Sequence, residues 1–178
     1  MLRRGDTLPK KYFRPDYIAD SITEIDFSYL QKLGIKAVLV DLDGTVVQRR
    51  KHEVAGNISD VLKTQPLNVF IATNRQSRGL HDLKSQLHAA GVVHPRGVWF
   101  KPFARYYKNA LSAIRLSPQE VAMIGDRYLQ DVYGANRVGI TTVLVRQLGQ
   151  SVNRADRFIS NKEARRTTRL AQEYQLVE

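Results

Sequence analysis

The sequence predicts an α/β protein in which helices cover both faces of a parallel sheet. Short apolar runs alternate with longer amphipathic stretches from Lys36 onward, and polar residues follow the apolar runs one after another. Because strands that alternate with helices of this length pair in parallel through right-handed crossovers, we expect a single three-layer, Rossmann-like domain. At 178 residues the chain is long enough for one domain with a sizeable core.

The five strands of the predicted sheet are the apolar runs KAVLVDL, LNVFIAT, GVWF, EVAMIG and ITTVLV. They occupy residues 36–42, 67–73, 97–100, 120–125 and 140–145. The stretches between them predict helices near residues 54–64, 78–90, 103–115 and 129–137. Turn residues mark the boundaries, because Gly91 closes the second helix and Ser117-Pro118 begins a turn before the fourth strand.

Two segments lie outside this alternation. Residues 1–33 form an N-terminal arm with a short expected helix at 27–33, residues 34–150 form the core, and residues 151–178 form a basic C-terminal segment with an expected helix over 161–174. The first part of the arm mixes Leu, Tyr and Phe with five cations, as an interfacial membrane anchor does. Packing on the core as a plain extension is the alternative, and composition favours it.

Composition narrows the classes of function. The chain has no Cys, which excludes disulfides, zinc-thiolate sites and thiol nucleophiles. No apolar run approaches the roughly 18 residues of a transmembrane helix, and the first residues lack the apolar core of a signal peptide, so we expect a cytoplasmic protein. The net charge of +11 favours anionic partners such as nucleic acid, acidic lipid surfaces or phosphorylated substrates, although solvated Lys and Arg alone explain most basic runs.

The predicted strands end in polar residues, and this pattern points to one site. In open parallel sheets, ligands bind beyond the carboxyl ends of the strands. The polar residues at these ends are Asp41 and Asp43 for the first strand, Thr73 and Asn74 for the second, Lys101 for the third, and Asp126 with Asp131 for the fourth. We expect these side chains to gather on one rim of the sheet.

The pair Asp41 and Asp43 bears most directly on the chemistry of this rim. Two acids spaced by two residues point to the same face of an extended chain and repel each other unless a cation lies between them. Taken alone, the pair is also explained by a strand that ends in an Asp-Gly turn. A calcium loop of the EF-hand type is excluded, because Val46 stands where Gly is required and His52 where the closing Glu belongs.

Three carboxylates with one ammonium and one hydroxyl are what a magnesium-dependent phosphoryl transfer requires. Mg²⁺ takes hard oxygen ligands, and positive groups offset the charge of a phosphate. With Mg²⁺ and Lys101 nearby, Asp41 can remain ionised as a nucleophile, while Asp43 can hold a proton and donate it to the leaving oxygen. Each residue singly is also explained as a strand end, a solvated loop or a helix cap, but the joint pattern favours the site.

In order and spacing, these residues resemble the four motifs of haloacid dehalogenase-like phosphatases. The motifs are Asp41-x-Asp43-Gly44-Thr45, Thr73, Lys101 and Gly125-Asp126-x-x-x-x-Asp131, and the resemblance covers residues 36–146. It implies an aspartyl-phosphate intermediate on Asp41, with Asp43 as the acid and then as the base on the hydrolytic water.

The same resemblance implies how the phosphate and the metal are held. Thr73 and Lys101 hold the phosphoryl group, and the adjacent Asn74 and Gly44 are further phosphate-binding candidates. Mg²⁺ is bound by Asp41, by Asp126 and by the main-chain carbonyl of Asp43. Asp131 supports the metal shell or Lys101.

The intervals between the motifs leave no room for a cap domain, which indicates the capless subclass IIIA of the superfamily. Two segments, PDYIADSITEIDFSYLQKLGIKAVLVDLDGT and GDRYLQDVYGANRVGITTVLV, resemble the YqeG-like branch, which is related to the mitochondrial phosphatidylglycerophosphate phosphatases. The second is the more distinctive, with Asn136, Arg137 and Gly139 after Asp131. The resemblance implies removal of the terminal phosphate of phosphatidylglycerophosphate. Gly44, where Asn is usual, and Arg75 depart from the branch.

Two other functions remain open at this point. The same chemistry can serve a soluble phosphate ester, such as a sugar phosphate or a nucleotide. A nucleic-acid-binding protein on the same scaffold belongs to a different class, and the basic residues favour it. Against it, the sequence has no nucleic-acid-binding motif, and Trp99 and the pair Tyr106-Tyr107 lie on predicted core elements, where we expect them to pack. The sequence leaves the oligomeric state open.

Overall fold

The computed structural model describes residues 3–4, 12–48, 51, 53–76 and 80–149. The basic C-terminal segment, including the helix expected at 161–174, lies outside the described residues, as do residues 5–11 of the N-terminal arm.

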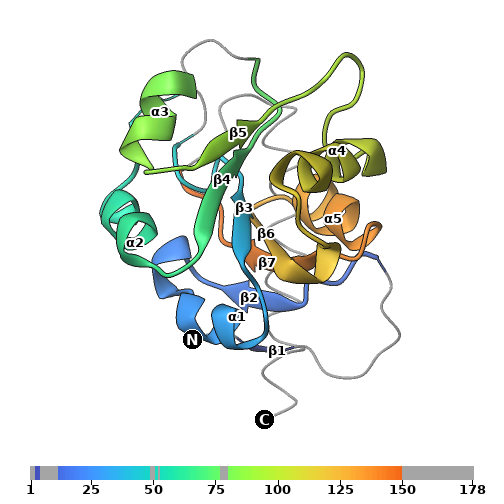
Figure 1. Cartoon of the computed structure of the whole chain (residues 1–178). Coiled ribbons are helices and arrows are strands. Elements are labelled where there is room, and N and C mark those ends of the chain that lie inside the picture. Colours follow the sequence, from blue (N-terminus) through green and yellow to red (C-terminus); the bar gives the residue numbers. More distant parts are fainter. Residues whose placement is uncertain (1–2, 5–11, 49–50, 52, 77–79, 150–178) are drawn as a thin grey trace.

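The centre of the fold is one seven-stranded sheet with the order β1-β2-β7-β6-β3-β4-β5 (Figure 1). Its strands are β1 (Arg3–Arg4), β2 (Tyr17–Ala19), β3 (Ala37–Val40), β4 (Asn68–Ala72), β5 (Gly91–Val93), β6 (Val121–Gly125) and β7 (Thr141–Val145). Six strands run parallel, and only β1 is antiparallel to its neighbour among the described strands. The α/β, Rossmann-like class is therefore confirmed.

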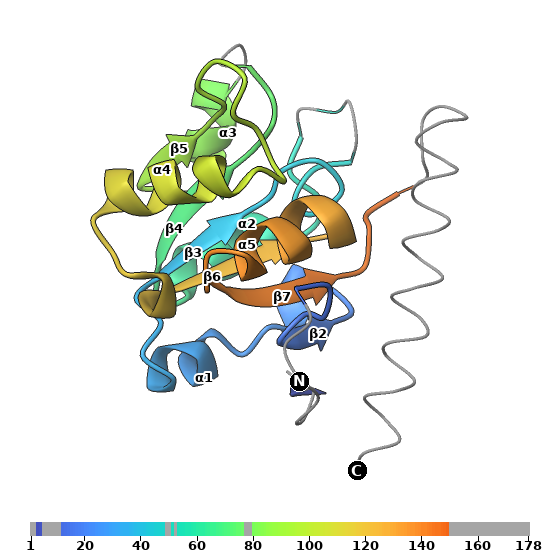
Figure 2. The same cartoon turned by 90° about the vertical axis from the view of Figure 1, so that its right-hand side faces the viewer.

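Helices lie on both faces of the sheet, with α2 and α3 on one side and α4 and α5 on the other (Figures 1 and 2). The helical elements are η1 (Ile22–Glu24), α1 (Phe27–Lys32), α2 (Ile58–Thr64), α3 (Leu80–Gln86), α4 (Ala104–Ile114), η2 (Pro118–Glu120), η3 (Tyr128–Tyr133) and α5 (Gly134–Asn136). The single helix expected at 129–137 is instead a π-helical turn, η3, followed by the short α5.

The central strand β3 shows how the two faces form. Val38 and Val40 belong to the apolar core under α1, α2 and α3, whereas Leu39 belongs to the core under α4. All four residues of β3 are buried, since a parallel strand covered on both sides reads as a continuous apolar run. This strand delivers Asp41 and Asp43 to the carboxyl edge of the sheet, between β4 and β6.

The third strand was predicted at the wrong place. The strand β5 is Gly91–Val93, and the predicted run Gly97–Phe100 is an exposed loop in which Arg96 bridges back to Trp99. Helix α3 ends earlier than expected, and His88, with a φ of 49°, turns the chain so that Ala90 N–H donates to Val69 of β4. Aromatic residues raise strand propensity wherever they occur, so the pattern alone misplaced this strand.

The N-terminal arm extends the sheet instead of standing apart from it. Strand β2 adds to β7, and the helix α1 lies close to its expected range. Asn136 donates to the carbonyl oxygens of Tyr12 and Arg14, and the ring of Phe13 stacks on Tyr133 with 4.4 Å between centroids. From Tyr12 onward, the arm packs on the domain.

Candidate active site

Four elements bring polar side chains to the carboxyl edge of the sheet. Asp41 follows β3, Thr73 follows β4 and Asp126 follows β6. Lys101 comes from the loop between β5 and α4, eight residues beyond the end of β5, and not directly from a strand end. The structure nonetheless brings it onto the same rim as the other residues.

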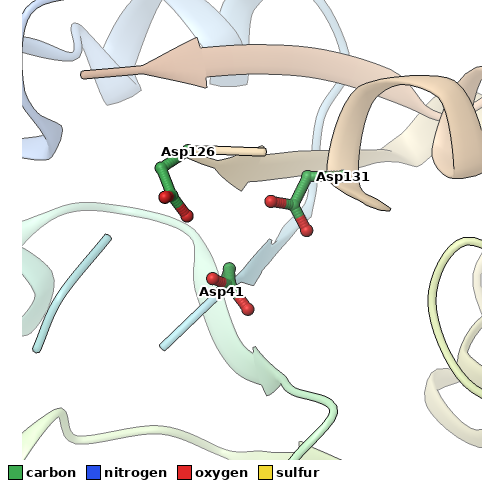
Figure 3. A group of neighbouring side chains, drawn as sticks. All are labelled: Asp41, Asp126 and Asp131. Carbon is green, nitrogen blue, oxygen red and sulfur yellow. The ribbon is translucent and has the colours of Figure 1, made fainter. Parts of the chain in front are cut away.

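Three carboxylates converge at the centre of this rim. Asp41, Asp126 and Asp131 each place an oxygen within 4.8 Å of the others, and all three residues are buried (Figure 3). Figure 3 shows their side chains pointing into one common space from three different parts of the backbone. Buried carboxylates at such distances require positive charge between them.

Lys101 supplies one positive charge. Its ammonium nitrogen lies 2.6 Å from Asp41 Oδ1 and 2.7 Å from Asp131 Oδ1, and it donates a third hydrogen bond of 2.9 Å to the carbonyl of Ala72. All three donors of the ammonium are therefore used. Asn74 holds the backbone of Lys101 on both sides, because its amide accepts from the Lys101 N–H at 2.8 Å and donates to the Lys101 carbonyl at 3.1 Å.

Two of the three carboxylates, those of Asp41 and Asp131, share the one ammonium of Lys101. Burial raises the pKa of Asp41 to about 7; the charge of Asp131 contributes to this rise, while Lys101 opposes it. Burial alone lowers the pKa of Lys101, but the two carboxylates outweigh it and hold that pKa well above its ordinary value. The lysine stays charged, and Asp41 titrates near neutrality until another cation arrives.

Asp131 is committed to the protein on both of its oxygens. Oδ1 accepts from Lys101, and Oδ2 accepts from the backbone N–H of Arg127 at 3.0 Å. A Cβ at Gly125 would lie only 2.3 Å from the carboxyl carbon of Asp131, so only glycine fits there. This geometry favours the support of Lys101 over direct metal binding for Asp131.

Asp126 is set by the turn after β3. The Thr45 hydroxyl donates to Asp126 Oδ1 at 3.3 Å, and a Cβ at Gly44 would lie 2.5 Å from Asp126 Oδ2. Gly44 also has a φ of 92°, which L side chains rarely adopt. Gly44 and Thr45 of the first motif therefore position the side chain of Asp126. The place of Thr45 in the sequence did not indicate this role.

Asp43 lies farther out than Asp41 and is bound by Arg75, for which the sequence indicated no role. Arg75 donates from Nε and from Nη2 to the two carboxylate oxygens of Asp43, at 2.8 and 2.6 Å. The Arg75 backbone N–H also donates to the Thr73 hydroxyl at 3.0 Å. Arg75 therefore links the Asp43 carboxylate to the Thr73 hydroxyl at the end of β4.

A second residue that sequence reasoning missed is Tyr106. Its hydroxyl donates to the carbonyls of Thr73 and Val93, at 3.2 and 2.8 Å, so it holds the end of β4 to the end of β5. Tyr106 and Tyr107 were expected to pack in the core, and the structure confirms that both are buried. Nothing in the spacing indicated the link to Thr73.

The donor set fits a small divalent cation. Asp41 and Asp126 offer carboxylate oxygens on one side of the cluster, and the shifted pKa of Asp41 marks a site where positive charge is favourable. Mg²⁺ prefers such hard oxygen ligands and takes few of them from protein. Asp131 acts on this site indirectly, because its carboxylate accepts a hydrogen bond from the Lys101 ammonium.

Comparison with known proteins agrees with this geometry. The HAD-hydrolase-like family matches residues 98–168, which include Lys101, Asp126 and Asp131. Over 88% of this chain and 90% of the relative, the sequence is 27% identical to the "Probable phosphatase YqeG" of Bacillus subtilis. Together, these matches support the resemblance of the chain to haloacid dehalogenase-like phosphatases.

Two further proteins are similar to this chain. A HAD-superfamily hydrolase from Geobacter sulfurreducens has a similar fold, with a TM-score of 0.52 and 16% identity over 72% of this chain and 99% of that one. A "Glyceraldehyde 3-phosphate phosphatase" of Pyrococcus furiosus is 46% identical over 43 residues, which are 24% of this chain and 18% of that protein.

Within the described part of the chain, no inserted domain covers the space above the site. Between Asp43 and Thr73 the described residues form α2, β4 and short β-bridges, and between Thr73 and Lys101 they form α3 and β5. Within the described residues, every helix is too short or too polar to span a membrane.

Proposed function

We propose that the protein is a Mg²⁺-dependent phosphomonoester hydrolase that works through an aspartyl-phosphate on Asp41. The observation that carries this proposal is the contact of Asp41 with Lys101 at 2.6 Å, inside a cluster that also holds Asp126 and Asp131. A buried carboxylate next to a buried ammonium and a cation seat is a suitable nucleophile for phosphorus. The catalytic groups all belong to residues 34–150, which we propose as the catalytic core between the arm at 1–33 and the segment 151–178.

The reaction has two steps. In the first, an oxygen of Asp41 attacks phosphorus, the bond from phosphorus to the ester oxygen breaks, and Asp43 gives a proton to that leaving oxygen. In the second, Asp43 takes a proton from a water that attacks the same phosphorus, which releases inorganic phosphate and restores Asp41. When bound, Mg²⁺ offsets the negative charge that the carboxylates and the phosphoryl group bring together.

The remaining polar residues position the phosphoryl group. Thr73 presents a buried hydroxyl at the end of β4, and Lys101 presents its charge beside Asp41. Gly44 leaves room at the turn, while Asn74 acts by holding the backbone of Lys101. Asp126 and the main-chain carbonyl of Asp43 complete, with Asp41, the proposed cation site.

For the substrate we propose phosphatidylglycerophosphate, which would place the protein at the cytoplasmic face of a membrane as a peripheral enzyme of phospholipid synthesis. The support is the resemblance to the YqeG-like branch, an active site with no cap over it in the described residues, and the net charge of +11. A basic protein gains about 1 kcal/mol per well-placed cation at an anionic lipid surface. A headgroup held in a bilayer also needs a site that is open from above.

A soluble phosphate ester is the second candidate. It is favoured by the 46% identity to the glyceraldehyde 3-phosphate phosphatase, although that match spans only 43 residues. The same nucleophile and cation site serve either substrate, so the local identity says more about the chemistry than about specificity.

The test is phosphate release in the presence of Mg²⁺ from phosphatidylglycerophosphate in vesicles, beside a panel of sugar phosphates and nucleotides. The native chain is compared with Asp41→Asn. Lipid turnover that disappears in the variant supports both parts of the proposal, and variant-sensitive release from soluble esters alone discards the lipid. No release from any ester, together with salt-dependent binding of oligonucleotides, would favour the nucleic-acid-binding alternative.

A further inference from the structure

Four apolar side chains stand exposed together on the loop between β5 and α4. Their exposed fractions are 70% for Val98, 43% for Trp99, 44% for Phe100 and 42% for Phe103. These four residues form the apolar loop cluster. Figure 1 shows the loop as a long excursion at the upper right, projecting beyond the sheet. Contiguous exposed apolar surface of this kind marks a site of interaction.

The apolar loop cluster is a built feature and not an open, extended tail. The rings of Trp99 and Phe103 meet edge to face at 6.0 Å between centroids, and those of Phe100 and Phe103 meet at 5.0 Å. Two backbone hydrogen bonds close the loop, from Trp99 N–H to Arg96 and from Phe103 N–H to Phe100. The loop then enters α4, whose buried tyrosines fix that helix on the sheet.

The charge around the cluster has one sign. From residue 83 to residue 119 the sequence contains no Asp or Glu, whereas it contains Lys84, Arg96, Lys101, Arg105, Lys108 and Arg115. Arg96 and Arg105 flank the cluster, are exposed, and form no ion pair with any described residue. The loop therefore combines exposed aromatic rings with cations that form no ion pair within the described part of the chain, and residues 83–119 contain no acid that would repel an anionic partner.

The cluster is also continuous with the active site. Phe100 is adjacent in sequence to Lys101, whose ammonium touches Asp41, and Phe103 follows two residues later. Asn74 holds the Lys101 backbone from the other side. Any surface that binds the cluster therefore lies next to the backbone of Lys101, whose ammonium contacts the nucleophile.

We propose that the apolar loop cluster docks the enzyme on an anionic lipid surface, with the aromatic rings in the interfacial region and Arg96 and Arg105 against the headgroups. Trp and Phe beside Lys or Arg is the composition that interfacial segments use. A protein partner would meet the same apolar surface, but the absence of acids over residues 83–119 fits a uniformly anionic surface better. The docking itself is independent of catalysis; its use in turning over a lipid rests on the proposed function.

The chain carries its own reporter for this docking, because Trp99 is its only tryptophan. The full-length protein is titrated with vesicles of equal parts phosphatidylglycerol and phosphatidylcholine, and with vesicles of phosphatidylcholine alone. We expect a blue shift of Trp99 emission and quenching by brominated acyl chains with the anionic vesicles, and a much weaker response with the neutral ones. An unchanged Trp99 spectrum with anionic vesicles would overturn the proposal.

Variants separate the cluster from the charge of the whole protein. Phe100→Ser/Phe103→Ser should weaken vesicle binding in a sedimentation assay by about tenfold or more. Arg96→Gln/Arg105→Gln should weaken it by roughly fivefold for each cation. The matched control Tyr29→Ser/Leu33→Ser removes an apolar residue exposed on α1 and another at its C-terminal cap, and it should bind like the native protein. If the two loop variants bind like the control, a different surface docks and the proposal falls.

Two results would assign the apolar loop cluster to a partner that is not lipid, and either one overturns the proposal. A blue shift of Trp99 that depends on protein concentration without vesicles would assign the cluster to contacts between copies of this chain. A change in Trp99 emission with oligonucleotides and none with vesicles would assign the apolar loop cluster to nucleic acid.

Docking and hydrolysis can fail separately. Asp41→Asn should bind vesicles like the native protein, because the cluster lies outside the catalytic groups. If the native protein binds vesicles but hydrolyses no ester, the proposed function fails and the docking stands. If the native protein hydrolyses soluble esters but anionic vesicles leave Trp99 emission unchanged, the docking fails and the proposed hydrolysis stands.

Discussion

Arg75 forms a bidentate pair with Asp43, donating hydrogen bonds of 2.8 Å from Nε and 2.6 Å from Nη2 to its two carboxylate oxygens. A fork of this kind matches a carboxylate and matches a phosphate equally well. Asp43 must exchange a proton during the proposed reaction, so its two oxygens cannot stay engaged throughout. A phosphoryl group entering beside Thr73 competes for the same guanidinium and would free Asp43 when it is needed.

Arg75→Ala should therefore weaken the binding of inorganic phosphate by about 10- to 100-fold, the usual value of a charge-assisted pair. The measurement is the competitive inhibition constant of phosphate against a soluble ester. Arg146→Ala is the control, since Arg146 forms an exposed ion pair with Asp20 and should change nothing. An unchanged inhibition constant in Arg75→Ala would mean that Arg75 only positions Asp43.

Lys101 is the central charge of the buried cluster. Lys101→Met leaves Asp41 and Asp131 facing each other without an ammonium, which should cost about 3 to 5 kcal/mol in the free energy of unfolding near neutral pH. The measurement is urea unfolding. Lys101→Met/Asp131→Asn removes one of the two charges and should recover part of the loss.

The loss in Lys101→Met should depend on pH with a definite sign. Without the ammonium the pKa of Asp41, already raised by burial, rises further, so the folded state binds a proton that the unfolded state has released. Stability should fall as the pH rises from about 4 toward neutrality and recover on acidification. A loss that is equal at both ends of this range would contradict the role given to Lys101.

Substitution of Gly44 tests whether the turn after β3 positions the carboxylate of Asp126. A Cβ there meets Asp126 Oδ2 at 2.5 Å, so Gly44→Ala should lower the affinity for Mg²⁺ by about 10- to 100-fold, as perturbing a ligand's support does. Gly34→Ala is a close control, because Gly34 has nearly the same φ, 91° against 92°, but open space around its Cβ. Both variants lose about 1 to 2 kcal/mol from the left-handed backbone; isothermal titration with Mg²⁺ should separate them.

The pKa of Asp41, raised to about 7 by burial, predicts how metal binding depends on pH. Only the ionised carboxylate binds a cation, so affinity for Mg²⁺ should increase about tenfold between pH 6 and pH 8, with release of a proton on binding. Calorimetry in buffers of different ionisation enthalpy measures both effects. In Asp41→Asn the remaining affinity should no longer follow this titration. An affinity that is flat over this range in the native protein would contradict the burial effect.

Much of the site was predictable because its residues follow strands in a strict order. The run that ends at Asp41 is apolar on both faces, and this property fixes both the strand and its central place in the sheet. Lys101 was expected at the rim, yet it reaches it through a loop and not from the predicted strand Gly97–Phe100. Its place follows from the Asn74 bonds to its backbone, which no sequence pattern revealed.

The parts that could not be predicted depend on tertiary contacts. Trp99 was expected in the core, but its segment lies outside the sheet and is exposed, because β5 had already formed from Gly91–Val93. Residues 17–19 join the sheet through β7, a pairing decided by long-range partners such as Asn136. The ion pair between Arg75 and Asp43 joins residues that are 32 positions apart, and no spacing along the chain predicts this pair.

The proposed reaction is tested most directly by trapping its intermediate. Native protein and Asp43→Asn are mixed with Mg²⁺ and p-nitrophenyl phosphate, whose leaving group departs without a proton from Asp43. The mixture is quenched within the first turnover and treated with borohydride, which reduces an aspartyl-phosphate to homoserine. Peptide mass spectrometry should find homoserine at residue 41, more of it in Asp43→Asn than in the native protein, and none without substrate. Continued phosphate release by the native protein with an unmodified Asp41 at every quench time would contradict the aspartyl-phosphate mechanism.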